Sequence, residues 1–142
     1  MWATNGQEGL KIFIDDMRPV PDGWHLATTN TEAIRILDTQ VVSAVSIDHD
    51  ISHDVKVGSV HRPYPCGETF EPTARFLAQM LREREARYFA DKTKGRATIY
   101  KFPITIHTAN AVGAKAIHAL FGGLEFVDVV IKLGAPCTRE VK

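Results

Sequence analysis

Short apolar runs alternate along this chain with longer segments in which apolar residues recur at helical spacing. The apolar runs cover residues 10–14, 24–27, 41–47, 102–106 and 126–131. Short runs of this kind are typical of strands, and the run at 41–47 predicts a buried strand of a parallel sheet. Helical spacing covers residues 29–38, 71–90 and 111–121. Strands that alternate with helices predict an α/β domain with a mostly parallel sheet.

The ends of these segments carry the expected local signals. Thr29 and Glu32 have the spacing of a capping box, Pro72 suits the first turn of a helix, and Gly122-Gly123 stops one. The run at 24–27 follows the first strand after nine residues, 15–23. A parallel crossover normally needs a dozen or more. We therefore expect the 24–27 strand at the periphery of the sheet.

Two stretches show no periodicity. Residues 51–69 contain two glycines and two prolines and predict a long loop, and residues 132–142 predict an irregular tail. Structureless loops of this length usually serve a function, for example as a lid over a site. With 142 residues the chain is expected to form one domain, 1–142.

Composition narrows the class of partner. Lys plus Arg and Asp plus Glu each number 17, so no global charge attracts nucleic acid or a membrane surface. The basic run at 92–96 is then best explained as a solvated loop, with RNA contact as the alternative. Cys66 and Cys137 have no metal or disulfide spacing, and no run is long enough to span a membrane. We predict a cytoplasmic protein without a membrane partner.

Asp15 and Asp16 directly follow the first strand, and Arg18 comes two residues later. Adjacent carboxylates repel each other, which a hard cation such as Mg²⁺ relieves. The planar guanidinium of Arg18 suits a phosphate. The alternative is an acidic turn in which Arg18 is only the counter-ion.

A second polar group follows the 41–47 strand. Asp48, His49 and Asp50 are consecutive, and His53 and Asp54 come shortly after them. Carboxylates and imidazoles together can bind a metal or transfer protons near neutral pH. A solvated strand-exit loop is the alternative.

The third group, His107, Thr108 and Asn110, lies where a strand gives way to a helix. Helix N-termini favour anions, and Thr108 and Asn110 add neutral donors for a phosphate, while His107 is a candidate acid or base. Asn110 is equally suited to cap the helix. The carboxyl ends of parallel strands share one edge, so all three groups are expected to meet there.

The same residues carry a resemblance to a known family. The stretches at 15–19, 46–51 and 107–114 resemble motifs of cyclic-phosphate processing receiver domains, which are relatives of response-regulator receivers. Receivers also carry a Lys after their last strand, a position that Lys132 matches. Two features depart from the family pattern. Thr108 replaces a Ser but keeps the hydroxyl, and the 51–69 loop is long and contains histidines.

The resemblance implies a flavodoxin-like, receiver-like fold, which we expect as a single three-layer α/β domain. It also implies action on a cyclic phosphate, such as a nucleotide or RNA end with a 2′,3′-cyclic phosphate. The predicted roles fall into three sets. The metal ligands, for Mg²⁺ or Mn²⁺, are Asp15, Asp16 and Asp48; the catalytic residues are His49, His107 and Asp50; the substrate-binding residues are Arg18, Thr108 and Asn110.

Two other functions stay open at this point. In a signalling module, Asp48 would accept a phosphoryl group as it does in receivers, although such a module has no need of two histidines at the site. In a non-catalytic protein, the same pocket would bind a cyclic nucleotide and release it intact. The sequence also leaves open whether the phosphoesterase needs a metal, and the oligomeric state.

Overall fold

The computed structural model describes residues 9–57, 60–91, 99–134 and 139–140, and for 52–57, 60–67 and 139–140 it describes the backbone alone. The strands are β1 (Leu10–Ile14), β2 (His25–Ala27), β3 (Val42–Ile47), β4 (Asp50–Val57), β5 (Val60–Thr69), β6 (Phe102–Thr108), β7 (Val127–Leu133) and β8 (Arg139–Glu140). The helices are α1 (Asn30–Thr39), α2 (Glu71–Ala90) and α3 (Ala111–Leu120).

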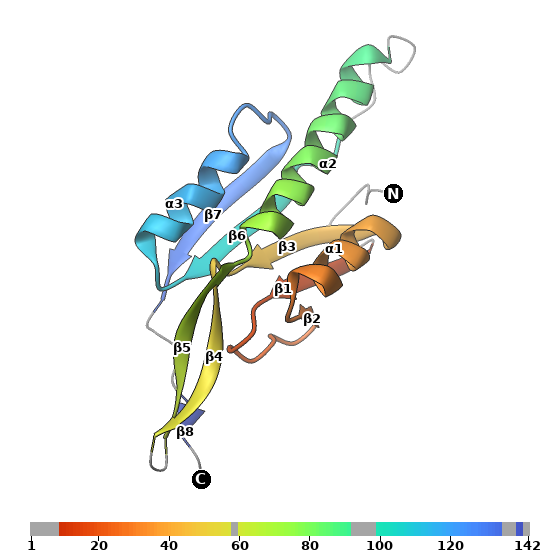
Figure 1. Cartoon of the computed structure of the whole chain (residues 1–142). Coiled ribbons are helices and arrows are strands. Elements are labelled where there is room, and N and C mark those ends of the chain that lie inside the picture. The colour runs from red at the N-terminus through yellow and green to blue at the C-terminus, as the bar shows by residue number, and fades with distance from the viewer. Residues whose placement is uncertain (1–8, 58–59, 92–98, 135–138, 141–142) are drawn as a thin grey trace.

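The main sheet has five parallel strands in the order β2-β1-β3-β6-β7 (Figure 1). This confirms the predicted α/β class with a receiver-like sheet. β2 pairs with β1 at one edge, so the short 24–27 run is a peripheral strand as expected. The connection between β1 and β2 contains no helix, which is how it spans two parallel neighbours with so few residues.

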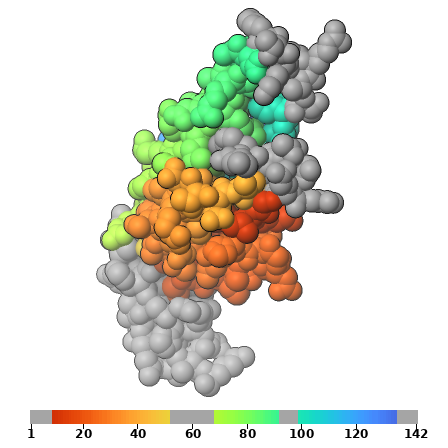
Figure 2. All heavy atoms as spheres, turned by 90° about the vertical axis from the view of Figure 1, so that its right-hand side faces the viewer, coloured from red at the N-terminus to blue at the C-terminus, as the bar shows by residue number. Residues whose placement is uncertain are grey.

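The helices of the described chain lie on one face of this sheet (Figure 1). The crossovers through α1, α2 and α3 all proceed in the same direction across the strand order, and crossovers of this kind are right-handed. In the space-filling view α1, in orange, and α2, in green, form one continuous surface (Figure 2). The described residues therefore build two layers, where three were predicted, because neither the β1–β2 connection nor the described chain after β7 supplies a helix.

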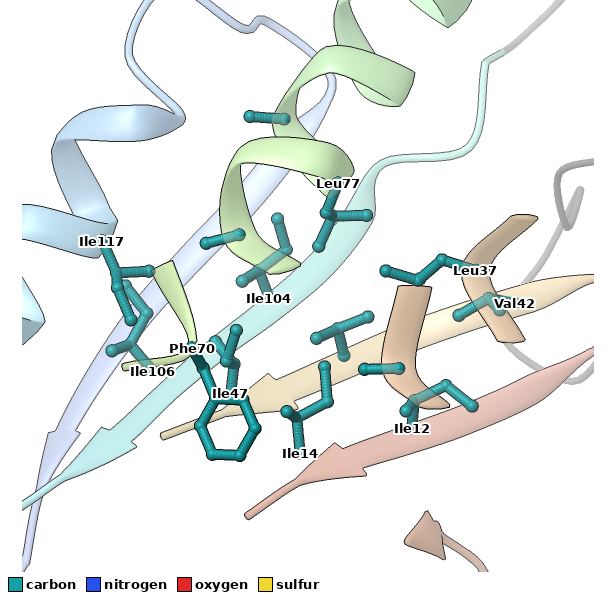
Figure 3. Packing of buried hydrophobic residues seen from close by; sticks show 14 of the residues in the cluster. Ile12, Ile14, Leu37, Val42, Ile47, Phe70, Leu77, Ile104, Ile106 and Ile117 are labelled. Atoms are coloured by element: carbon teal, nitrogen blue, oxygen red, sulfur yellow. The ribbon is translucent and has the colours of Figure 1, made fainter. Parts of the chain in front are cut away.

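The hydrophobic core fills the space between the helices and this face of the sheet (Figure 3). Its fully buried members include Ile12, Ile14, Val45, Ile47, Ile104 and Ile106 from the strands and Leu77 and Ile117 from the helices. Side chains alternate along a strand. Phe13, Ser46 and His107 therefore point to the opposite face, which we call the open face.

The prediction of a long loop at 51–69 was wrong, and so was the prediction of an irregular tail for residues 132–133 and 139–140. The rest of that tail, 135–138 and 141–142, lies outside the described residues. β4 and β5 form an antiparallel hairpin, β8 pairs with β5, and β7 extends to Leu133. The hairpin projects away from the main sheet (Figure 1). The sequence did not predict this hairpin because Pro63 and Pro65 lie within β5. Proline lacks a backbone donor and is rare inside strands.

Some predictions fall outside the described residues. These are the basic run at 92–96 and the side chains of His53, Asp54, Cys66 and Cys137. None of the helices that the structure describes has the length and apolar character to cross a membrane.

Candidate active site

Polar side chains gather at the carboxyl edge of the main sheet, where β1, β3 and β6 end. Asp15 follows β1, Asp48 follows β3, and His107 belongs to the last residues of β6. Asp15, Asp16 and Asp48 each offer an oxygen within 4.8 Å of the others. We call these three residues the acidic cluster. The predicted convergence of separate strand ends is therefore present.

Arg18 bridges two members of the acidic cluster. Its Nη1 lies 3.3 Å from Asp15 Oδ2 and 3.4 Å from Asp48 Oδ2. The turn that brings it there is held by Asp15 Oδ1, which accepts the backbone N–H groups of Met17 (2.8 Å) and Arg18 (3.1 Å). Such turns, in which an Asp side chain binds the backbone two or three residues on, follow strands readily. The predicted phosphate ligand thus faces the predicted metal ligands.

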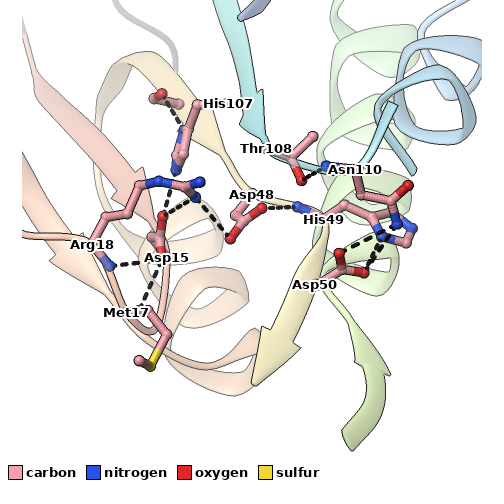
Figure 4. Close-up of polar contacts among 10 residues, drawn as sticks. Asp15, Met17, Arg18, Asp48, His49, Asp50, His107, Thr108 and Asn110 are labelled. Carbon is pink, nitrogen blue, oxygen red and sulfur yellow. Dashed lines mark hydrogen bonds and ion pairs between the residues drawn. The ribbon is translucent and has the colours of Figure 1, made fainter. Parts of the chain in front are cut away.

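His107 joins the acidic cluster from β6 (Figure 4). Its Nε2 lies 2.9 Å from Asp15 Oδ2 and its Nδ1 lies 2.7 Å from Ser46 Oγ. The imidazole also stacks on Phe13, with ring centroids 4.3 Å apart and planes within 5°. Both ring nitrogens are therefore engaged, and the ring is held in one orientation by three neighbours.

The environment pushes the pKa values of two neighbouring carboxyl groups apart. Burial raises the pKa of Asp15, but hydrogen bonds from His107 and from the Met17 and Arg18 amides outweigh it, so that pKa lies below its usual value. Burial and the charge of Asp15 raise the pKa of Asp48, against hydrogen bonds from Thr108 and the His49 amide and the charge of Arg18. Relative to an ordinary aspartate, the surroundings of Asp15 favour its ionised form and those of Asp48 favour its protonated form.

His49 lies in a different group, on the helix side of the same edge (Figure 4). Its Nδ1 is 2.7 Å from Asp50 Oδ1, and its Nε2 is 2.8 Å from Glu71 Oε2, at the start of α2. Asn110 Nδ2 lies 3.3 Å from Asp50 Oδ2. We call His49, Asp50, Glu71 and Asn110 the helix-side cluster. The structure thus divides the predicted site residues between two neighbouring groups.

The helix-side cluster is tightly packed. Asn110 caps α3, since its Oδ1 accepts the N–H of Gly113 at 2.9 Å, which confirms the capping role considered for it. Gly113 lies against the imidazole of His49, where a side chain has no space. Burial lowers the pKa of His49, but hydrogen bonds to Asp50 and Glu71 outweigh it, so that pKa is raised. These bonds favour a charged imidazolium.

The two clusters meet at Asp48 and Thr108. The backbone N–H of His49 donates to Asp48 Oδ1 at 2.7 Å, so one peptide unit belongs to both. Thr108 is buried, and its Oγ1 accepts the N–H of Asn110 at 3.1 Å. Lys132, the residue matched to the receiver lysine, is exposed within β7 and lies in register with His107.

Four residues of the site had no predicted role: Phe13, Ser46, Glu71 and Gly113. Ser46 and Gly113 nevertheless lie inside the resembling motifs at 46–51 and 107–114. Strand alternation also indicates Ser46, because it shares a face with Asp48 two residues later and with His107 on the next strand. Glu71 had no such signal, since an acidic residue in the first turn of a helix has an ordinary local explanation.

A five-stranded parallel sheet in this order, with acidic residues after β1 and β3 and a hydroxyl at the end of β6, defines a receiver-like α/β domain. A family model described as the Cyclic-phosphate processing Receiver domain matches residues 10–122, and the chain belongs to that family. No curated protein and no solved structure matches the chain.

Proposed function

We propose that this protein is a phosphoesterase that opens cyclic phosphates, such as the 2′,3′-cyclic phosphate of an RNA end or a nucleotide. The observation that supports this best is the contact of Arg18 with the acidic cluster at a rim that also holds His107. This places a guanidinium, clustered carboxylates and an imidazole together, which is what phosphoryl chemistry requires. Membership of a cyclic-phosphate processing family supports the substrate class.

The acidic cluster would hold a divalent cation, Mg²⁺ or Mn²⁺. Three carboxylates with oxygens within 4.8 Å of one another form the hard oxygen donor set that these ions prefer. A bound cation would polarise a phosphoryl oxygen. Arg18 now offsets the charge of Asp15 and Asp48, and it would turn to the non-bridging oxygens of a substrate phosphate.

We assign the acid–base role to His107 in preference to His49. His107 bonds directly to the acidic cluster, whereas the ring of His49 is held between Asp50 and Glu71. Both ring nitrogens are engaged in the observed arrangement, so a proton would pass between His107 and a substrate oxygen through the Ser46 hydroxyl, or after substrate replaces Ser46 or Asp15 at the ring. His49 then acts as a positioning residue, with Asp50 as its partner.

Three residues were predicted to bind the substrate: Arg18, Thr108 and Asn110. Arg18 has the strongest geometric support, because it contacts the acidic cluster. Thr108 and Asn110 already serve the start of α3, so we propose that they act through that helix N-terminus, whose amides favour an anion.

The test is hydrolysis of 2′,3′-cyclic nucleotides with and without Mg²⁺ or Mn²⁺, followed by separation of the 2′- and 3′-monophosphate products. We expect Asp48→Asn and His107→Gln to lower kcat by about 10²-fold or more. Matched controls are Asp38→Asn and His118→Gln, which change exposed residues on α1 and α3. Equal activity in an Asp48→Ala, His107→Ala double variant would remove the assignment.

A second candidate is a phosphoacceptor signalling domain. It is favoured by Asp48, which follows β3, lies beside two further carboxylates and receives a hydrogen bond from Thr108. Mass spectrometry after treatment with acetyl phosphate separates the two, because a labile adduct on Asp48 without turnover of cyclic nucleotide supports signalling. Tight binding with recovery of intact nucleotide would instead indicate a non-catalytic binder.

A further inference from the structure

The strand at the far edge of the main sheet, β7, is unusually exposed for a strand rich in apolar residues. Among the described strands it pairs only with β6, and it ends the strand order. Val130 is 45% exposed, Ile131 38% and Leu133 59%. Edge strands are normally protected from pairing with another chain by a proline, a bulge, a short length or charged side chains. β7 has seven residues and no proline, and its two charged residues, Asp128 and Lys132, are of opposite sign.

The sequence of β7 is complementary to itself when it is paired antiparallel. If Val130 lies opposite a second Val130, then Asp128 lies opposite Lys132 and Lys132 opposite Asp128. The same register places Val129 opposite Ile131 and Val127 opposite Leu133. Each oppositely charged cross-strand pair contributes roughly 0.2–1 kcal/mol, whereas like charges in that position repel.

The distribution of β7 side chains between the two faces of the sheet is compatible with this register. Val129 and Ile131 pair with Ile104 and Ile106 of β6, which face the helices. Asp128, Val130 and Lys132 therefore belong to the open face. An antiparallel pair keeps directly opposite residues on the same face, so charges would meet charges on the open face and apolar side chains would meet on the helix side.

We propose that β7 is a self-association edge that binds β7 of a second copy of this chain, with the two-fold axis at Val130. The axis runs perpendicular to the sheet, so the two five-stranded sheets become one continuous sheet with all helices on the same side. The partner is a second copy of this chain because an antiparallel β7 places Asp128 of each copy opposite Lys132 of the other.

The helix layer allows this pairing. α3 packs on both β6 and β7, so it lies over the edge of the sheet that the proposed pairing would join to its copy. The two copies of α3 would then lie on the same side of the continuous sheet, flanking the two-fold axis.

The first experiment measures assembly of the full chain by sedimentation velocity over a wide concentration range. We expect a monomer–dimer equilibrium. Asp128→Lys and Lys132→Asp should each weaken the dimer by about tenfold or more, because each places two like-charge pairs across the axis. The double variant Asp128→Lys, Lys132→Asp should restore it, since the pairs are opposite in sign again. Val20→Lys is the control and should change nothing, because Val20 is an exposed residue of the β1–β2 connection, and both strands lie on the opposite side of the strand order from β7.

The second experiment tests the position of the axis. In a background with Cys66 and Cys137 changed to Ser, Val130→Cys should form an intermolecular disulfide under mild oxidation, because the residue lies opposite itself. Asp128→Cys and Val20→Cys should crosslink far less. A monomer at every concentration, or a double charge variant no better than the single ones, would overturn the proposal. Circular dichroism of each variant confirms that it is folded.

Discussion

Replacing Gly113 with alanine tests how the helix-side cluster is packed. Gly113 lies in the first turn of α3, where it needs no special backbone conformation. By helix propensity alone, Gly113→Ala should stabilise the protein by up to about 1 kcal/mol. The structure predicts the opposite sign, because a Cβ there would lie 2.5 Å from Nδ1 and 2.9 Å from Cδ2 of the His49 ring.

The magnitude follows from what the His49 ring can do in response. It is fixed by Asp50 at 2.7 Å and Glu71 at 2.8 Å, so it cannot rotate away without losing charge-assisted bonds. Forcing extra volume into a packed site costs about 1–3 kcal/mol. After the propensity gain, we expect Gly113→Ala to lower the free energy of unfolding by about 1–2 kcal/mol, or Tm by roughly 3–8 °C for a chain of this length.

A double-mutant cycle decides whether the imidazole is the cause. Urea unfolding would be measured for the parent, Gly113→Ala, His49→Ala and the double variant. Once the ring is gone, Gly113→Ala should be neutral or stabilising, so the two changes should couple by about 1–3 kcal/mol. If Gly113→Ala costs as much without the ring of His49 as with it, the packing argument is wrong.

Three further predictions concern the two clusters. Ser46→Ala removes the partner of His107 Nδ1 and should lower kcat for cyclic-phosphate hydrolysis by about 10- to 100-fold, with little change in KM. That is the usual loss when a residue that orients a functional side chain is removed. Ser43→Ala, which changes a buried serine of the same strand, is the control in the same steady-state assay. Because the pKa of His49 is raised in the folded state, its contribution to stability is complete below its ordinary pKa of 6.5 and is lost as pH rises through the folded value. Urea titrations should therefore show the difference between the parent and His49→Gln shrinking as the pH rises above 6.5. Mg²⁺ at about 100 times its Kd should stabilise the parent by about 2.7 kcal/mol, and Asp15→Asn should abolish this shift in differential scanning calorimetry.

The fold was predictable wherever burial dictates the sequence pattern. The runs at 10–14, 41–47 and 102–106 are rich in apolar residues because their strands are central in the sheet, with helices covering one face. The hairpin of β4 and β5 was not predictable in this way. Backbone pairing defines it, and its prolines argue against a strand. The number of layers could not be predicted either. A third layer requires a helix on the second face of the sheet, and none of the described helices lies there.

For the site, the sequence predicts the edge of the sheet correctly but not how the residues divide there. Asp48 and His49 are consecutive, so they leave β3 on opposite sides. One joins the acidic cluster and the other packs against α2 and α3. Strand alternation predicts that the two side chains point to opposite sides. It does not predict which residues His49 contacts, because Glu71 and Gly113 are distant from it in the sequence.

The peptide between Asp48 and His49 makes the two clusters one mechanical unit. Its N–H orients the Asp48 carboxylate, while the carbonyl of His49 accepts the N–H of Phe70, the fully buried residue before α2. The β4–β5 hairpin leaves and re-enters the domain at this point, with Asp50 paired to Thr69. Any force that moves the base of the hairpin must therefore act on the backbone that positions Asp48. On the proposed function, the imidazole of His49, held between two carboxylates and against Gly113, would resist that movement and so act on the site without contact with a substrate.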